Sequence, residues 1–284
     1  MTRLKPFRHA VPQHFTAAPA LLAWLCLFAA PLAYFFVISF WSVRARIMRP
    51  DFTPKNYAAT ISEYGDVMVS TLAIGLAVAL VTTLIAYGFA FAIRFRAGRW
   101  GNVLLLVTLI TLFGGYLVKI YAWKSILGRD GLINATLLGL RVIDEPLTIF
   151  IYSAFGVIVT LTYFLLPFAI LPIYGSMRGI PDSLIEAARD LGATPLGAGA
   201  QIVLPLCERG ISVAFLLTFL ITVGDYVTPR YVGGGASMMG HFIETQFSFG
   251  FNWPMGSAMS FTLMAASLVV FLLCRFAFRR VVAQ

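Results

Sequence analysis

The feature that most constrains this chain is a series of long apolar stretches in which charged side chains are almost absent. Each is close to the roughly 20 residues that an α-helix needs to cross about 30 Å of hydrocarbon. The stretches are continuously apolar instead of alternating, which favours helices over the strands of a barrel. The sequence therefore predicts an all-α integral membrane protein with six transmembrane helices, Ala18 to Phe40, Val67 to Ile93, Val103 to Trp123, Thr148 to Ile173, Ile211 to Val227 and Gly256 to Phe276.

Composition supports a membrane protein and argues against other classes. Of the 284 residues, 60% are hydrophobic and only 12% are charged, which is more apolar surface than one soluble core can bury. The net charge of +9 could indicate nucleic acid, but the basic residues fall between the apolar stretches and form no run with interleaved aromatics. We therefore expect membrane lipid and no nucleic acid among the partners.

The N-terminal region has basic residues before an apolar run, as a signal peptide does. That run extends over residues 10–43 with no Asp, Glu, Lys or Arg and with His14 as its one histidine, whereas a signal peptide has an apolar region of roughly 7 to 15 residues. We expect an uncleaved first span, with residues 1–17 as a cytoplasmic tail and residues 18–284 as a single transmembrane domain.

The distribution of Lys and Arg gives an orientation. With six spans both termini lie on one side, and twelve of the 21 basic residues fall there, namely Arg3, Lys5, Arg8, Arg94, Arg96, Arg99, Arg178, Arg189, Arg209, Arg275, Arg279 and Arg280. The other nine are Arg44, Arg46, Arg49, Lys55, Lys119, Lys124, Arg129, Arg141 and Arg230. The positive-inside rule then predicts cytoplasmic N- and C-termini.

One polar segment, residues 183–206, is too short and too polar to cross a membrane. Ser183 lies three residues before Glu186, the spacing of a capping box, and predicts a helix that begins near Leu184. Gly192 suits the left-handed end of that helix, and Thr194 before Pro195 predicts a second helix start. Periodicity places Leu184, Ala187, Ala188 and Leu191 on one face. An amphipathic loop on the membrane surface is one interpretation of this segment.

A family resemblance gives the second interpretation. The order Glu186-Ala187-Ala188, three residues, Gly192, nine residues, Ile202, one residue and Leu204-Pro205 resembles the EAA loop of permease subunits in binding-protein-dependent ABC importers. The chain departs from it at Gly199 and Ala200, where the family often has an aromatic residue.

The resemblance implies a type I ABC importer permease, with residues 178–208 as a cytoplasmic coupling loop that docks on an ATPase. The residues it implies for coupling are Ser183, Leu184, Glu186, Ala187, Ala188, Leu191 and Gly192. The implied partners are a homologous second permease, two ATP-binding subunits and a periplasmic solute-binding protein, in a bacterial inner membrane. ATP and Mg would then bind to the ATPase subunits, and this chain would carry no cofactor.

A narrower resemblance concerns the solute. Residues 119–134, 224–234 and 252–260 are similar to those of spermidine/putrescine permeases of the PotB type. A polyamine is a flexible polycation, which carboxylates and aromatic faces attract. The candidates for its path are Asp225, Tyr226, Glu244, Trp123 and Tyr121. An opine or an amino-acid derivative is the alternative, because Arg230, Lys119 and Lys124 lie on the same side.

The sequence contains no motif of a known catalytic site. The phosphate-binding loop of ATPases requires Gly, four residues and Gly-Lys-Ser or Gly-Lys-Thr, and this pattern is absent. Cysteine–histidine clusters and serine-hydrolase elbows are absent as well, so we expect neither a catalytic residue nor a metal site. A six-span scaffold or enzyme subunit that does no transport is the rival class.

Overall fold

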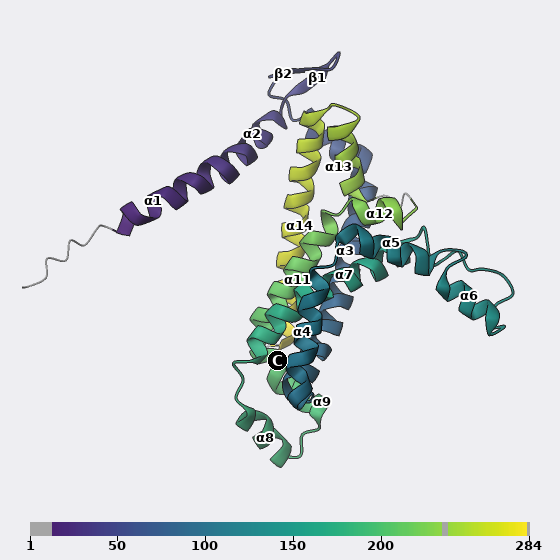
Figure 1. Cartoon of the computed structure of the whole chain (residues 1–284). Helices are drawn as coiled ribbons and strands as arrows, with labels where there is room; N and C mark the ends of the chain where they lie inside the picture. Colours follow the sequence, from purple (N-terminus) through teal and green to yellow (C-terminus); the bar gives the residue numbers. More distant parts are fainter. Residues whose placement is uncertain (1–12, 235–237, 283–284) are drawn as a thin grey trace, which may run out of the picture.

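The computed structural model describes residues 13–234 and 238–282, and most of them are helical (Figure 1). The helices are α1 (Gln13–Trp24), α2 (Ala30–Ile38), α3 (Lys55–Phe95), α4 (Gly101–Leu112), α5 (Tyr116–Leu127), α6 (Leu132–Gly139), α7 (Ala154–Met177), α8 (Asp182–Asp190), α9 (Pro195–Ala198), α10 (Leu204–Leu206), α11 (Glu208–Val223), α12 (Val227–Tyr231), α13 (Met239–Ser248) and α14 (Trp253–Val282). Short π-helical turns lie at Leu25–Ala29 and Gly199–Val203, and a 3₁₀ turn at Gly98–Trp100.

The centre of the bundle is formed by α3, α7 and α11, and α14 packs against α3 and α13. Small residues such as Gly75, Ala79, Ala86 and Ala90 cover the buried face of α3. In lipid, helices associate by close packing, because hydrocarbon is as apolar as a leucine side chain. The small residues of α3 therefore let the neighbouring helices approach closely.

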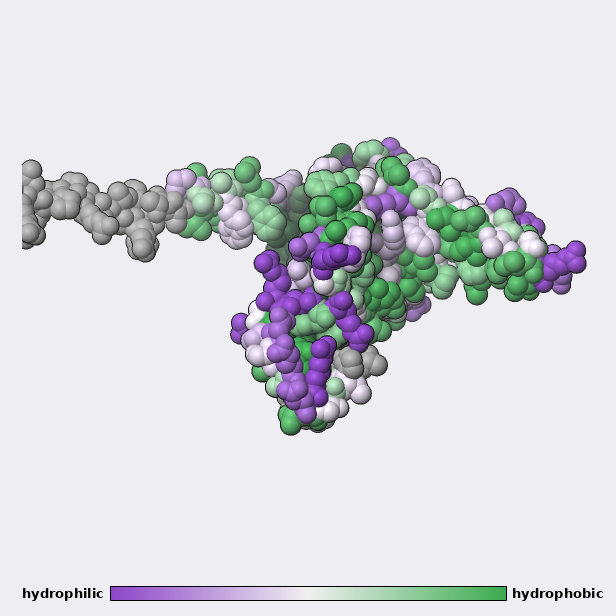
Figure 2. Space-filling view, turned by 60° about the horizontal axis from the view of Figure 1, so that its bottom comes forward, coloured by the Kyte–Doolittle hydropathy of each residue, from purple (hydrophilic) through white to green (hydrophobic). Residues whose placement is uncertain are grey.

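The bundle has two distinct ends (Figure 1). We call one the α8 end: α3, α7 and α14 finish there, and α4 and α11 begin there. The opposite end, called the α13 end, carries α13 and a β-hairpin at its tip, and α5, α6 and α12 nearer the middle of the bundle (Figure 1). Figure 2, which brings the α8 end forward, shows hydrophilic residues gathered over that end.

The number of apolar helices agrees with the six spans that the sequence predicts. Four helices are long and apolar enough to cross a membrane, and two bent pairs bring the possible number to six. The four are Pro19–Ile38, Lys55–Phe95, Ala154–Met177 and Trp253–Arg280. Side chains such as Leu84 (74% exposed) and Leu273 (63% exposed) face outward, as lipid-facing residues do.

The predicted continuous helix from Val103 to Trp123 is wrong. The chain breaks after α4, and the two arms of the break differ in direction by 98°. Gly114 and Gly115 lie in the break, and the Lys119 ammonium donates a hydrogen bond of 2.5 Å to the Thr111 carbonyl. A cation at the end of a helix satisfies its last carbonyl groups. Lys119 therefore stabilises the break.

The predicted fifth span also differs from the structure. Helix α11 ends at Val223 and not at Val227, and a 73° bend separates it from the preceding turn at residues 199–206. At 1.5 Å per residue, its 16 residues cover roughly 24 Å. Asp225 therefore lies beyond the helix, in the connection to α12.

The first apolar span, Pro19–Ile38, includes most of α1 and all of α2 and stands apart from the bundle (Figure 1). Only 6% of its most apolar part is buried. Helix α1 begins at Gln13, so the predicted tail of residues 1–17 overlaps it. Residues 1–12, with Arg3, Lys5 and Arg8, lie outside the described residues. The boundary at residue 17 stays a prediction.

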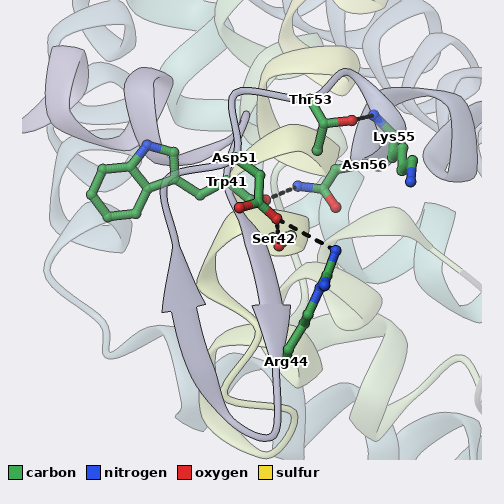
Figure 3. A network of polar contacts seen from close by, with 7 residues as sticks. All are labelled: Trp41, Ser42, Arg44, Asp51, Thr53, Lys55 and Asn56. Atoms are coloured by element: carbon green, nitrogen blue, oxygen red, sulfur yellow. Dashed lines mark hydrogen bonds and ion pairs between the residues drawn. The ribbon is translucent and has the colours of Figure 1, made fainter.

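A polar network at the α13 end shapes the chain between α2 and α3 (Figure 3). Strands β1 (Ser42–Arg44) and β2 (Ile47–Arg49) pair antiparallel, with Val43 opposite Met48. The Asp51 carboxylate accepts a hydrogen bond from the Ser42 hydroxyl, and the Asn56 amide donates 2.8 Å bonds to the Ser39 and Trp41 carbonyls. These bonds join the hairpin to the start of α3.

Close packing in the bundle gives a first prediction. A methyl group at Gly210 of α11 would lie 2.6 Å from the Pro172 carbonyl oxygen of α7, so Gly210→Ala forces the two helices apart. We expect a loss of about 1–3 kcal/mol in unfolding free energy, the usual cost of overpacking. Thermal unfolding of the purified protein in detergent measures it.

Gly88→Ala is the matched control, because Gly88 lies on α3 with open space around its Cα. Alanine is the better helix former, so this variant should be as stable as the parent or more stable. Equal stability of the two variants would show that α7 and α11 are not packed as described.

Candidate functional site

Helix α8 begins two residues earlier than the sequence predicts. Its N-cap is Pro181, whose side chain has no oxygen, and Asp182 is the first helical residue. The predicted capping box of Ser183 and Glu186 is therefore wrong. The acidic group of Asp182 lies in the first turn, where it interacts favourably with the helix dipole.

The end of α8 agrees with the prediction for Gly192, whose φ is +84°. The Gly192 amide donates to the Arg189 carbonyl at 2.8 Å, and the Ala193 amide donates to the Ala188 carbonyl at 2.9 Å. This pair of bonds is a Schellman motif, which satisfies the last carbonyl groups of a helix. The predicted second start is present too, because the Thr194 hydroxyl oxygen accepts a 3.1 Å bond from the Gly197 amide.

The two faces of α8 differ from the predicted division at one residue. Ile185 and Ala188 are 4% and 5% exposed and face the rest of the chain. Ala188 therefore does not share an outward face with the predicted leucines, and this part of the prediction is wrong. Leu184 and Leu191 are 42% and 89% exposed, and Ala187 is exposed between them. Their i, i+3, i+7 spacing gives α8 an exposed apolar stripe beside its charged residues.

Helix α3 holds both halves of the segment around α8. The Arg94 guanidinium forms a 2.9 Å ion pair with Asp182 and donates a 3.1 Å hydrogen bond to the Ile180 carbonyl. The Tyr87 hydroxyl donates a 2.6 Å bond to the Gly199 carbonyl, beyond the glycine turn. Sequence reasoning missed these residues, although Tyr87 and Arg94 lie seven residues apart and so on one face of α3.

A further ion pair lies at the α8 end. The Arg279 side chain near the end of α14 pairs with Glu208, the first residue of α11, at 2.6 Å. A cation near a helix C-terminus and an anion at a helix N-terminus both complement the helix dipoles. The pair therefore joins α14 to α11 beside the segment that α3 holds.

At the α13 end, Asp225 has a structural role. It is 8% exposed, and its two carboxylate oxygens accept hydrogen bonds from the Val227 and Thr228 amides at 3.0 and 3.2 Å. The Thr228 hydroxyl in turn lies 2.7 Å from the Tyr116 hydroxyl of α5. Asp225 thus caps α12 and fixes its position beside α5.

The five predicted path residues do not form one group. Tyr226 and Glu244 line the same cavity, of about 500 Å³, between α11, α13 and α14. Tyr121 instead packs on Tyr231 of α12, and Trp123 on Tyr163 of α7, with ring centroids 5.4 and 5.7 Å apart. Within the described residues, no group of three His, Cys, Asp or Glu side chains could hold a metal ion.

Comparison with known proteins identifies the family. Residues 86–284 match the family described as the binding-protein-dependent transport system inner membrane component. This range is most of the chain and includes α8 with its flanking turns. The chain belongs to this family. It is therefore the inner-membrane permease component of an ABC importer, and the alternative of a scaffold that does no transport is wrong.

Several relatives of this permease are similar over most of their length. PotB of Escherichia coli K12, a spermidine/putrescine transport system permease protein, is 33% identical over 221 residues, 77% of this chain and 80% of PotB. PotB of Haemophilus influenzae is 31% identical over 226 residues, 78% of this chain and 79% of that one. The inner membrane ABC transporter permease protein YdcU of Escherichia coli K12 is 30% identical over 234 residues, 78% and 71% of the two chains.

Solved structures show the same fold for this permease. A chain of a bacterial ABC transporter that imports the acidic polysaccharide alginate superposes with a TM-score of 0.73 at 14% identity, over 94% of this chain and 95% of that one. A chain of the MetNI methionine ABC transporter superposes with a TM-score of 0.52 at 20% identity, over 77% of this chain and 94% of that one. The all-α type I importer fold predicted from the sequence is confirmed.

The turn that ends α8 gives a second prediction. Gly192 has open space around its Cα, so Gly192→Ala meets no clash, but its positive φ costs about 1–2 kcal/mol with a Cβ. We expect α8 to open more often and trypsin to cleave the α8–α9 segment about five to thirty times faster.

Gly175→Ala is the control for this experiment, since Gly175 also has open space around it and does not have a positive φ. Its cleavage rate should equal that of the parent. Parental cleavage of Gly192→Ala would contradict the left-handed turn.

Proposed function

We propose that this permease forms, with a homologous second permease, the path by which a polyamine such as spermidine or putrescine crosses the inner membrane. The single observation that carries the coupled transport is the apolar stripe on α8, which is exposed among the described residues and lies outside the apolar spans. The similarity to two PotB proteins over more than three quarters of the chain supports the solute.

In the proposed mechanism, α8 is the coupling helix and the α8 end is cytoplasmic. Each end of the bundle has nine of the basic residues that the structure describes, so the orientation rests on the family's cytoplasmic EAA loop. Two ATPase subunits close on ATP with Mg and move α8. A periplasmic solute-binding protein delivers the polyamine to the α13 end. We propose no catalytic residue and no cofactor in this chain.

Movement of α8 would reach the rest of the bundle through α3. Arg94 and Tyr87 join α3 to both halves of the coupling segment. Helix α3 has 41 residues, roughly 60 Å, and so extends from the α8 end to the α13 end. Nearer the middle of α3, the Thr71 hydroxyl oxygen accepts a 2.8 Å bond from the Met239 amide at the start of α13. One rigid helix thus connects the coupling segment to α13.

Two basic residues that favoured a zwitterionic solute have contacts within the chain. Lys119 bonds to the Thr111 carbonyl and lies over the Phe164 ring, at 5.2 Å from its centroid. Lys124 lies 6.0 Å from the Tyr231 ring centroid. Both cations therefore interact with α4, α7 or α12, whereas Arg230, the third such residue, is exposed. The similarity to the PotB proteins favours a polyamine as the solute that we propose.

The apolar stripe of α8 gives a third prediction. Leu191→Glu should weaken binding of the ATPase subunit about ten- to a hundredfold, because burying a leucine at an interface is worth about 1.5–3 kcal/mol. Leu191 is 89% exposed, so the substitution leaves the permease itself folded. Co-purification of the ATPase subunit and polyamine uptake by proteoliposomes measure the effect.

Arg189→Gln is the matched control, with the same change in charge at an exposed residue outside the stripe. It should bind the ATPase subunit as the parent does. Full binding by Leu191→Glu would contradict docking through this stripe.

The Arg94 contacts give a fourth prediction. Arg94→Gln should retain the ATPase subunit but reduce polyamine uptake several-fold per ATP hydrolysed, because the ion pair that holds the start of α8 on α3 is then lost. The double variant Arg94→Asp with Asp182→Arg restores the ion pair and should recover part of the uptake. If the single and double variants both take up as much polyamine per ATP hydrolysed as the parent does, α3 does not transmit the movement.

A further inference from the structure

The cavity between α11, α13 and α14 measures about 500 Å³. Its wall is formed by the C-terminal end of α11, one face of α13 and the first half of α14. The residues that the argument needs are Gly224, Tyr226, Glu244, Ser260 and Ser267. The remaining wall is largely apolar.

Glu244 is the charged residue among those that line the cavity. Its side chain is 18% exposed, and its Oε2 atom is buried with no hydrogen-bond partner among the residues described. The nearest basic group is His241, whose Nδ1 lies 3.9 Å away and also has no hydrogen-bond partner among the residues described. This contact is an ion pair when the imidazole is protonated, but it is too long for a hydrogen bond. A buried carboxylate oxygen without a partner is costly, so the site is complete only with a proton or a cation beside it.

The other polar groups of the wall also favour a cation. The Ser260 and Ser267 hydroxyls donate to the Gly256 and Leu263 carbonyls of their own helix at 2.8 and 2.7 Å, which leaves their oxygen lone pairs as acceptors. Gly224 lies at the C-terminal end of the 16-residue helix α11, where the helix dipole attracts positive charge. Tyr226 is 43% exposed and offers an aromatic ring to a cation.

We propose that this cavity is a binding site for one ammonium group of an organic amine, with Glu244 as its carboxylate ligand and Tyr226 as its aromatic wall. The inference deepens the proposed function and rests on it for the claim that the amine is transported. It also assigns different roles to the two acidic candidates. Asp225 caps α12 with both oxygens, whereas Glu244 has an oxygen available to the ligand.

The first test is putrescine uptake by the complete transporter in proteoliposomes. Glu244→Gln keeps the shape of the side chain and removes its charge, and it should raise the KM for uptake about tenfold or more while the ATPase subunit stays bound. Glu244→Asp keeps the charge, and its KM should lie between those of the parent and Glu244→Gln. The matched control is Glu63→Gln, an exposed residue of α3 towards the α13 end, which should leave the KM unchanged. An unchanged KM in Glu244→Gln would overturn the assignment.

The second test does not depend on the transported solute. n-Butylammonium should raise the thermal unfolding temperature of the assembled transporter, and n-butanol at the same concentration should not. The rise should be absent in Glu244→Gln and present in Glu63→Gln. Equal shifts in both variants, or none in the parent, would overturn the binding site.

The two tests separate the site from the function. If the parent imports no putrescine but n-butylammonium stabilises it through Glu244, the polyamine function fails and the ammonium site stands. If the parent imports putrescine and Glu244→Gln matches it in both tests, the site fails and the function stands.

Discussion

The structure depends on one constraint, that backbone groups inside a bilayer have no water to bond with. The apolar stretches must therefore be helical, and each departure from a helix needs a polar group from the chain itself. Lys119 supplies one at the break after α4, and Asp225 supplies another where α11 gives way to α12. A charged residue in an apolar stretch suggests a functional site, but here two such residues satisfy the backbone at places where the helices end. Glu244 differs from both, because its Oε2 atom is buried without a hydrogen bond and its contact with His241 is 3.9 Å long.

In the proposed mechanism, the same constraint makes α3 the mechanical link of the permease. The polar segment around α8 cannot enter lipid, so it can be attached to the bundle only where a spanning helix emerges. Helix α3 reaches that point with Tyr87 and Arg94, which bond to the two sides of the Gly192 turn. Near its middle, at Thr71, the same helix bonds to α13, which carries Glu244 on the cavity wall. A displacement of α8 by a motor subunit would therefore reach the proposed ammonium site through a single helix.

Sequence reasoning predicted what depends on local chemistry. The apolar helices, the left-handed turn at Gly192 and the helix start at Thr194 follow from composition and spacing, and all are present. Sequence reasoning failed where a contact joins residues that are distant in the sequence. The N-cap of α8 is Pro181 and not the predicted Ser183. Asp182 forms an ion pair with Arg94, 88 positions earlier in the chain. The break at Gly114 and Gly115 was missed because its flanks are as apolar as a continuous span. The cavity around Glu244 brings together three helices and could not be read from spacing.

The central claim is that α8 lies on the cytoplasmic side and the β-hairpin on the periplasmic side. Its most direct test is labelling of single cysteines, Leu191→Cys and Ile47→Cys, in a chain whose Cys26, Cys207 and Cys274 are replaced by serine. Both residues are well exposed, at 89% and 62%. A membrane-impermeant maleimide, on cells with a permeable outer membrane, should label position 47 at once and position 191 only after the inner membrane is opened. Labelling of position 191 with the inner membrane intact would place α8 out of reach of any cytoplasmic ATPase and contradict the account.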